Sequence, residues 1–314
     1  MKTGAVTVRR FHEDACDKCK LELVGGEKGL DRVIREPAIN RPGLALAGFL
    51  RHFAFRRIQV LGMAENEYLL SLPPARRNAG LRRLFESRIP CVVVTRNRAV
   101  LPEISALARE FNVPLFRSPL VTGPFINAAT LAMERLAAPC TTRQGTMVDI
   151  LGIGVLIEGK PSIGKSEAAL ALVERGHSLV ADDLVLFRLA EHGVIGAALP
   201  ATRYHIEIRG LGIIHVPSLF GVSSVREEKS LDLVVTLKDI GEVENSGGGH
   251  EPKFCELLGV KIPSITVSVA SGRELGNIIN VAALNEKLKK LGHDAAKELD
   301  EGLMAKMSKR ALET

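Results

Sequence analysis

Residues 159–166 combine the side chains that a phosphate-binding loop needs. They fit the pattern G-x-x-x-x-G-K-[ST] and read Gly159, Lys160, Pro161, Ser162, Ile163, Gly164, Lys165 and Ser166. Glycines let backbone N–H groups converge on phosphate oxygens, and a helix that follows directs the positive end of its dipole at the same anion. Lys165 is expected to neutralise the β- and γ-phosphates, Ser166 to bind Mg²⁺, and Ser162 to shape the loop.

The elements on either side of this loop decide whether it binds phosphate, because the pattern alone occurs in many proteins by chance. An apolar run, Val155-Leu156-Ile157, predicts a strand before it, and residues 166–174 predict a strong helix that Gly176 ends. An ordinary glycine-containing strand-to-helix turn is the alternative. A strand and a helix on either side of the loop favour a nucleotide site.

Two carboxylates follow the next predicted strand, residues 178–181. Asp182 and Asp183 come directly after it, at the kind of strand end where ligands collect in open α/β sheets. Adjacent side chains on an extended chain point in opposite directions, so the two carboxylates should have different roles. One could act as general base on an acceptor hydroxyl, and the other could orient water, metal or a loop. A solvent-facing turn is the alternative.

A second polar pair lies in the run EIRGLGIIHV at 207–216. Alternation along a strand would place Glu207 and Arg209 on one face, as a carboxylate for a metal and a cation for phosphate. A salt-bridged surface pair explains the same spacing equally well.

The elements around these residues predict an α/β fold in two domains. Residues 57–62 and 91–95 read as buried strands, and residues 75–87 and 102–112 as helices, which indicates a small N-terminal α/β domain. The pattern changes near residues 137–142, where a helical stretch meets Pro139. We therefore divide the chain at 1–136 and 137–314. In the second part, strands should dominate up to about residue 270, with a flexible loop at 245–249 and a helical tail from about residue 276.

Composition fits a soluble protein of the cytoplasm. No apolar run reaches the roughly 18 residues of a membrane span, and the first 20 residues are too polar for a secretory signal. Basic residues (42) and acidic residues (36) are interleaved and aromatic content is 4%, which argues against nucleic acid as a partner. Five cysteines do not suggest a disulfide framework. Cys16, Cys19 and His12 could form half of a zinc site, but a second pair at a recognisable spacing is missing.

The motifs together resemble the HPr kinase/phosphorylases of bacteria, which phosphorylate a serine of the phosphocarrier HPr and remove that phosphate with inorganic phosphate. The similarity spans nearly the whole chain. In the N-terminal part, the similarity is carried by NRPGL at 40–44 and RIQVLG at 57–62. In the C-terminal part, it is carried by VDI at 148–150, the loop at 159–167, ADD at 181–183, EIRGLGII at 207–214, GR at 272–273 and VAALN at 281–285.

This resemblance implies a C-terminal P-loop kinase domain with a mixed sheet and C-terminal helices, and an N-terminal domain of regulatory type. It implies ATP phosphates on residues 159–166, Mg²⁺ on Ser166 and Glu207, and Asp182 as the base, supported by Asp183 and Arg209. In the reverse reaction Asp182 would return its proton to the leaving serine, with inorganic phosphate or pyrophosphate in the site. The family also implies a hexamer, an HPr-like partner and a role in regulating carbohydrate metabolism.

The sequence departs from the family pattern at two places. Family members usually carry histidine where this chain has Gln144, and an amide cannot titrate near neutral pH, so we predict weakened or pH-shifted phosphorylase activity. The acceptor-side region at 245–250 is glycine-rich, and an expected Arg-Leu-Gly element is not evident nearby. The acceptor could therefore differ from HPr.

Three hypotheses follow from these residues. The leading one is a protein-serine kinase/phosphorylase that uses ATP and Mg²⁺. A nucleotide-binding regulatory module without turnover is favoured by Gln144 and opposed by Lys165, Ser166, Asp182 and Glu207. A P-loop kinase that acts on a small molecule is the third. His205 and His215 flank the Glu207 motif and could approach the site.

Overall fold

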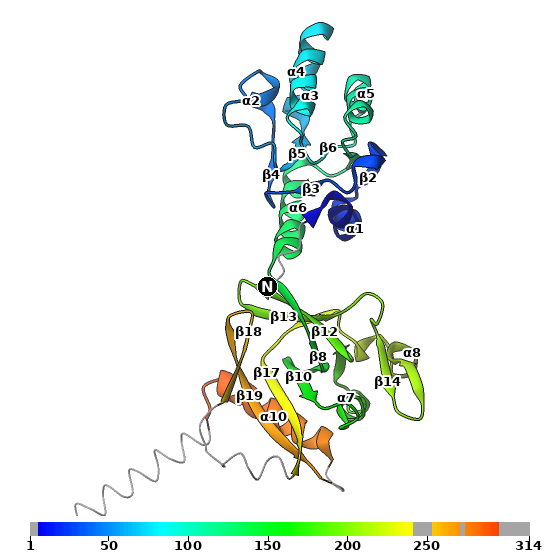
Figure 1. Cartoon of the computed structure of the whole chain (residues 1–314), viewed down its shortest axis with the longest axis vertical. Helices are drawn as coiled ribbons and strands as arrows, with labels where there is room; N and C mark the ends of the chain where they lie inside the picture. The colour runs from blue at the N-terminus through cyan, green and yellow to red at the C-terminus, as the bar shows by residue number, and fades with distance from the viewer. Residues whose placement is uncertain (1–5, 241–252, 271–273, 295–314) are drawn as a thin grey trace, which may run out of the picture. The chain divides into compact units, whose positions relative to one another are not determined.

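A computed structural model describes residues 6–240, 253–270 and 274–294 of the chain. The predicted loop at 245–249, the acceptor-side region at 245–250 and the GR pair at 272–273 lie outside these ranges. The chain divides between Ala138 and Pro139 into two compact units, close to the boundary at 136/137 inferred from the sequence. Figure 1 labels most of the helices and many of the strands of the two units.

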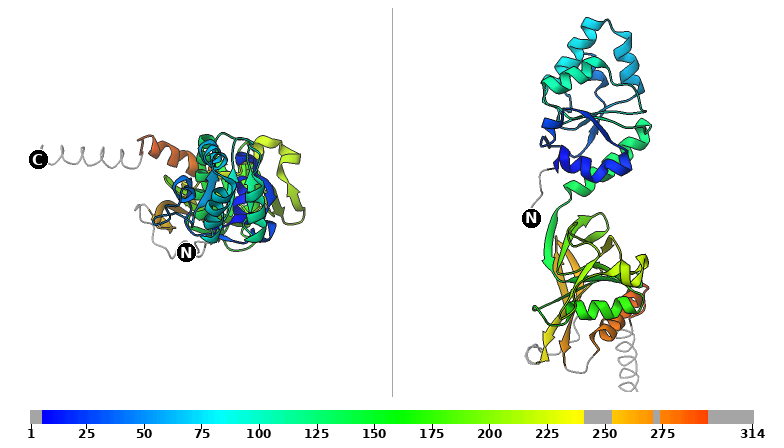
Figure 2. Two further views of the ribbon diagram at one scale, coloured as in Figure 1. Left: turned by 90° about the horizontal axis from the view of Figure 1, so that it is seen from above. Right: turned by 90° about the vertical axis from the view of Figure 1, so that its right-hand side faces the viewer.

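The N-terminal unit has a five-stranded sheet with helices on both faces (Figure 2). The strand order is β2-β7-β6-β5-β4, in which β4 to β7 run parallel and β2 is antiparallel. Its strands are β2 (Glu22–Gly25), β4 (Ile39–Asn40), β5 (Ile58–Leu61), β6 (Val92–Val94) and β7 (Leu115–Arg117). A separate pair joins β1 (Val6–Thr7) to β3 (Val33–Ile34).

Two apolar cores fill the spaces between this sheet and its helices. On one face Phe116 packs with α1 (Val8–Cys19) and α6 (Thr122–Ala137). On the other face Leu115 packs with α2 (Gly43–Leu46), α3 (Met63–Ser71), α4 (Pro74–Glu86) and α5 (Pro102–Glu110). The buried β-branched runs predicted at 57–62 and 91–95 form β5 and β6, as expected for parallel strands covered on both faces.

The C-terminal unit is built on a six-stranded mixed sheet of order β11-β9-β10-β17-β19-β18. Its strands are β9 (Thr146–Ile150), β10 (Ile153–Gly159), β11 (Ser178–Ala181), β17 (Leu233–Asp239), β18 (Lys253–Leu257) and β19 (Val260–Val269). β10, β17 and β19 run parallel, and the other neighbours are antiparallel. The α/β fold with a mixed C-terminal sheet is therefore confirmed.

Each face of the six-stranded sheet covers a core. One face packs on α7 (Lys165–Glu174), α10 (Leu275–Lys290), α8 (Val216–Phe220) and the hairpin β14 (His205–Ile208) with β15 (Gly212–His215). The other face packs on a four-stranded sheet of β16 (Glu228–Ser230), β13 (Gly193–Ala198), β12 (Leu184–Ala190) and β8 (Cys140–Gln144). Short 3-10 turns lie at Glu27–Gly29 and Val222–Ser224.

The order of three strands determines where the polar residues gather. β9 lies between β10 and β11 and is antiparallel to both, so β10 and β11 run in the same direction. Their carboxyl ends and the amino end of β9 therefore share one edge of the sheet. Gly159, Asp182 and Thr146 are consequently brought to the same place.

Candidate active site

The loop after β10 takes the conformation that its glycines allow. A Cβ on Gly159 would stand 2.9 Å from the Leu237 carbonyl oxygen, so this position packs too closely against β17 for a side chain. Gly164 is the N-cap of α7, and its φ of +103° is a conformation that residues with a Cβ rarely adopt. The amino end of α7 consequently opens directly from the loop, as anion binding requires.

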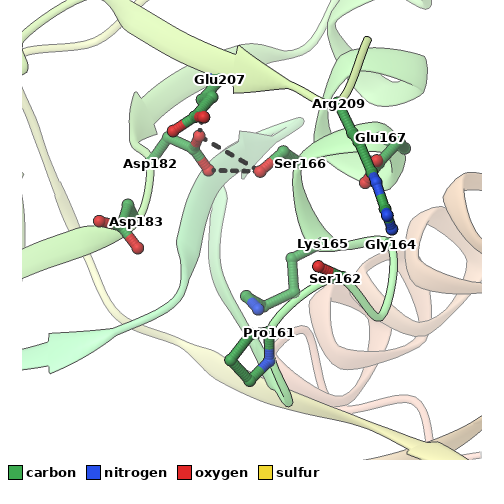
Figure 3. Close-up of a pocket in the computed structure, with 10 residues that line it drawn as sticks. All are labelled: Pro161, Ser162, Gly164, Lys165, Ser166, Glu167, Asp182, Asp183, Glu207 and Arg209. Atoms are coloured by element: carbon green, nitrogen blue, oxygen red, sulfur yellow. Dashed lines mark hydrogen bonds between the residues drawn. The ribbon is translucent and has the colours of Figure 1, made fainter. Parts of the chain in front are cut away.

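Lys165 folds back over this loop. Its Nζ donates to the carbonyl oxygens of Gly159 at 3.2 Å and Lys160 at 2.9 Å. Figure 3 shows the ammonium group on the Pro161 side of the loop. The cation is thus held against the first two residues of the loop.

Asp182 is the centre of the polar network. Its carboxylate accepts hydrogen bonds from Thr146 Oγ1 at 2.6 Å, from Ser166 Oγ at 3.1 and 3.2 Å, and from the Glu207 N–H at 3.1 Å. The residue is only 5% exposed. An ionised carboxylate is an acceptor only, so it satisfies all of these donors at once. The network ties the phosphate loop, β9 and the β14 hairpin to one carboxylate.

Asp183 has a different orientation from its neighbour. It adopts a left-handed conformation with φ of +64°, its carbonyl accepts from the Gly145 N–H at 3.0 Å, and its side chain is exposed. In Figure 3 its carboxylate points away from Ser166, whereas that of Asp182 points toward it. The two carboxylates consequently face different surroundings within one cleft.

The β14 hairpin brings Glu207 and Arg209 to the loop. Ile206 and Ile208 are buried in the same core as α7, which leaves Glu207 on the exposed face. The expectation that one strand carries both polar residues needs a correction, because β14 ends at Ile208 and Arg209 lies in the turn. Gly210, with φ of +86°, lies in that turn, and Gly212, with φ of +85°, begins β15. Arg209 nevertheless points toward the start of α7 (Figure 3).

A cleft of about 430 Å³ contains most of the predicted site residues. The predicted residues that line it are Pro161, Ser162, Gly164, Lys165, Ser166, Asp182, Asp183, Glu207 and Arg209. Gly159, Lys160 and Ile163 belong to the loop but do not line the cleft. Gln144 lies at the end of β8, opposite Leu184, with an exposed side chain, and is likewise outside the lining.

Two residues of the site were missed from the sequence. Glu167 lines the cleft at the first turn of α7, and its place directly after Ser166 could have drawn attention to it. Thr146 is fully buried and donates to Asp182. A hydroxyl residue at the start of a strand that continues with Met147 and Val148 was the available signal.

The histidines and cysteines considered in the sequence lie away from the lining of this cleft. His205 and His215 are cross-strand neighbours with ring centroids 5.0 Å apart, and neither lines the cleft. His12 packs on Phe116, with ring centroids 5.1 Å apart. Within residues 6–240, 253–270 and 274–294, no three His, Cys, Asp or Glu side chains form a group that could hold a metal ion. In the same ranges, no helix is both long and apolar enough to cross a membrane.

The oxygen ligands at the cleft suit a magnesium ion that is shared with a nucleotide. Ser166 and Glu207 line the cleft with Asp182, so a hydroxyl and carboxylates are available. Mg²⁺ is usually bound by one or two carboxylates together with substrate phosphates and water, rather than by a cage made of protein side chains alone. The donors present therefore fit this cation.

Comparison with known proteins gives consistent results along the whole chain. The family model described as HPr Serine kinase N terminus matches residues 6–133, and the one described as HPr Serine kinase C-terminal domain matches residues 135–303. The HPr kinase/phosphorylase of Leptospira biflexa is 40% identical over 313 residues, which cover 98% of this chain and 96% of that protein. The HPr kinase/phosphorylase of Caldicellulosiruptor bescii is 40% identical over 306 residues, covering 96% and 97%.

A solved structure, the Hpr(Ser) kinase/phosphatase from Coxiella burnetii, is 32% identical. The match covers 51% of this chain and 98% of that chain, with a TM-score of 0.46.

Proposed function

The chain belongs to the HPr kinase/phosphorylase family, and we propose that it transfers the γ-phosphoryl group of ATP to a serine of an HPr-like phosphocarrier and removes it again with inorganic phosphate. The proposal rests above all on the network in which one buried carboxylate, Asp182, contacts the phosphate loop through Ser166 and the β14 hairpin through Glu207. Residues 137–314 would form the catalytic domain, and residues 1–136 a domain of regulatory type.

Nucleotide binding is assigned to residues 159–166. The N–H groups of the loop and the first turn of α7 would hold the phosphates, and Lys165 would add a positive charge beside them. Arg209 and Ser162 line the same cleft, which supports a role for the arginine at the transferred phosphoryl group. Mg²⁺ would be held by Ser166 and Glu207, and when bound it neutralises charge on the phosphate oxygens.

Asp182 is assigned the proton transfer. In the forward direction its carboxylate takes the proton of the serine hydroxyl while the seryl oxygen bonds to the γ-phosphorus and ADP leaves. In the reverse direction an oxygen of inorganic phosphate attacks the phosphoserine, protonated Asp182 returns the proton to the seryl oxygen, and pyrophosphate is released. Ser166 can donate its hydroxyl proton to Asp182 while its oxygen lone pair binds the cation.

Asp183 and Gln144 are assigned supporting roles. Asp183 lines the cleft with its carboxylate turned from Ser166, so it is suited to orient water or the acceptor rather than to accept the proton. Gln144 replaces a titratable side chain with an amide, and the proposal attributes to it a weaker or pH-shifted phosphorylase reaction. The proposal also places the enzyme in the cytoplasm as a homo-oligomer, with a hexamer suggested by the family.

Transfer of label from γ-labelled ATP to purified HPr tests this function. The parent should label HPr on serine in the presence of Mg²⁺, and added phosphate should release pyrophosphate from the phosphorylated HPr. Asp182→Asn should reduce both rates by about 100-fold or more, since a positioned general base contributes about 10²–10⁴-fold, while ATP is still retained. Asp183→Asn is the matched control, and it should reduce the two rates by less than about 10-fold.

The same assay separates the other hypotheses. If the parent binds ATP but labels no acceptor, the regulatory module is supported instead. Label that reaches a small molecule but not HPr would identify a kinase with another acceptor. Unchanged transfer by Asp182→Asn would refute the role of the carboxylate.

A further inference from the structure

The N-terminal unit contains a cleft of about 420 Å³ whose lining is strongly basic. Four of its lining residues are arginines, and no acidic residue lines it. The residues that matter here are Arg32, Arg35, Arg56 and Arg88, together with Phe55 and Pro90 on the apolar wall. The volume lies within the range of about 300–1,000 Å³ that is typical of small-molecule sites.

The fold brings these residues together from three separate segments. Arg32 and Arg35 flank β3, Arg56 comes two residues before β5, and Arg88 lies between α4 and β6. They therefore gather at the amino ends of the parallel strands β5 and β6. This edge of the sheet belongs to the N-terminal unit alone, so the cleft is separate from the phosphate loop of the other unit.

Arg32 is the fixed member of the cluster. Its guanidinium donates to the carbonyl oxygens of Ile89 at 3.1 Å, Phe111 at 3.3 Å and Asn112 at 3.3 Å. Burial lowers the pKa of Arg32 from its ordinary value, and the positive charge of Arg88 lowers it further. Arg32 and Arg88 therefore carry like charges on the lining of one cleft.

Nearby carboxylates do not compensate this charge. Asp31, next to Arg32, bonds to Arg9 at 2.9 Å, and Glu36, next to Arg35, bonds to Arg57 at 2.8 Å. Among the residues that the structure describes, eight arginines of this unit pair with carboxylates. The four arginines of the cleft form no such pair within the described ranges, although they lie together. Their positive charges are therefore open to an anion from outside the chain.

Guanidinium groups match phosphate oxygens with two parallel hydrogen bonds, which makes phosphate the anion that best fits several arginines. The Arg56 guanidinium also lies 5.5 Å from the centroid of the Phe55 ring, so one wall of the cleft offers an aromatic and cationic surface. We propose that this cleft is a second ligand site, which binds a phosphate-bearing small molecule on Arg35, Arg56 and Arg88, with Arg32 as the fixed cation behind them. None of its residues lines the cleft of the phosphate loop.

Calorimetric titration of the full chain with inorganic tripolyphosphate, without divalent ions, tests the proposal. The parent should show two classes of site, one on the phosphate loop and one in the cleft. Lys165→Ala should weaken the first and leave the second. Arg56→Gln/Arg88→Gln should weaken the second by about 10-fold or more, because hydrogen bonds between charged groups are strong, and should leave the first.

Arg10→Gln/Arg76→Gln is the matched control, because both side chains are exposed and lie outside the cleft. This double variant loses the same two positive charges as the cleft variant. It should keep both classes of site. The proposal is overturned if Lys165→Ala abolishes all binding, or if the cleft variant retains the second site. Equal weakening by the control pair would also overturn it, because that result would indicate diffuse attraction to net charge. The Lys165→Ala titration decides the question even if the cleft variant does not fold.

Discussion

Thr146→Val should impair catalysis without touching the phosphate loop. Thr146 is fully buried, its Oγ1 donates to Asp182 Oδ1 at 2.6 Å, and Asp182 is itself 5% exposed. Valine keeps the shape of threonine and removes only the hydroxyl. Because water has little access to this carboxylate, the lost donor is not replaced. A hydrogen bond to a charged group contributes about 1.5–3 kcal/mol, and we expect a loss of unfolding free energy in that range.

A loss of the same size should appear in the activation free energy of catalysis and therefore in kcat. Asp182 keeps its bonds to Ser166 and to the Glu207 N–H, but it loses the contact that fixes Oδ1 from β9. If this contact holds the base in position for the acceptor, kcat should fall by about 10- to 150-fold, since each 1.4 kcal/mol corresponds to a factor of ten. The KM for ATP should stay within about two-fold, because a residue that acts only on the base does not change ground-state binding of nucleotide.

Thr146→Ser and a double-mutant cycle separate positioning from packing. Serine keeps the hydroxyl and loses one methyl group, so its kcat should remain within about three-fold of the parent while stability falls by about 1 kcal/mol. In an Asp182→Asn background, Thr146→Val should cost little further activity. The reasoning is refuted if Thr146→Val turns over like the parent, or if Thr146→Ser loses as much kcat as the valine variant. Phosphate transfer to HPr and urea unfolding provide the two measurements.

Three further predictions concern Gln144, His177 and the cysteines. Gln144→His should raise the phosphorylase rate or shift its profile between about pH 6 and 8, where histidine titrates, while kinase activity is retained; unchanged rates and profiles would contradict the role given to the amide. Burial lowers the pKa of His177 below 6.5, so the unfolded chain takes up the proton first and stability should fall as pH drops below that value. Urea midpoints at pH 7.5 and 5.5 should therefore differ less in His177→Gln than in the parent, and an equal difference would exclude this contribution. Burial raises the pKa of Cys19 to about 11 and also raises that of Cys91, so neither thiol should react with DTNB at pH 8 until the chain is unfolded; reaction of all five cysteines in the folded chain would oppose this.

Several features could be predicted from the sequence because they depend on residues close together in the chain. The strand, glycine loop and helix around Lys165 are encoded within about twenty residues, and the structure has β10 and α7 in these positions. The helix predicted at 75–87 is α4, since its apolar spacing and Pro74 specify it locally. Asp182 could be singled out because it directly follows a buried strand.

Other features depended on how distant segments pair. The contact between Thr146 and Asp182 joins residues 36 positions apart, and it exists because β9 lies between β10 and β11. Gln144, close to Thr146 in sequence, lies outside the lining of the cleft, because β8 pairs with β12 in the other sheet. Arg209 lies in a turn because glycines on either side of Leu211 end the strand early.

What the sequence by itself determined was the chemistry available: a loop for phosphate, a carboxylate after a strand, and a family to which these motifs belong. What only the tertiary structure decided was which side chains meet. Strand order and register bring Thr146 to Asp182, and they gather four arginines from three segments of the N-terminal unit into one cleft. Both results arise from contacts between distant parts of the chain, whose formation depends on the whole apolar core rather than on any local pattern.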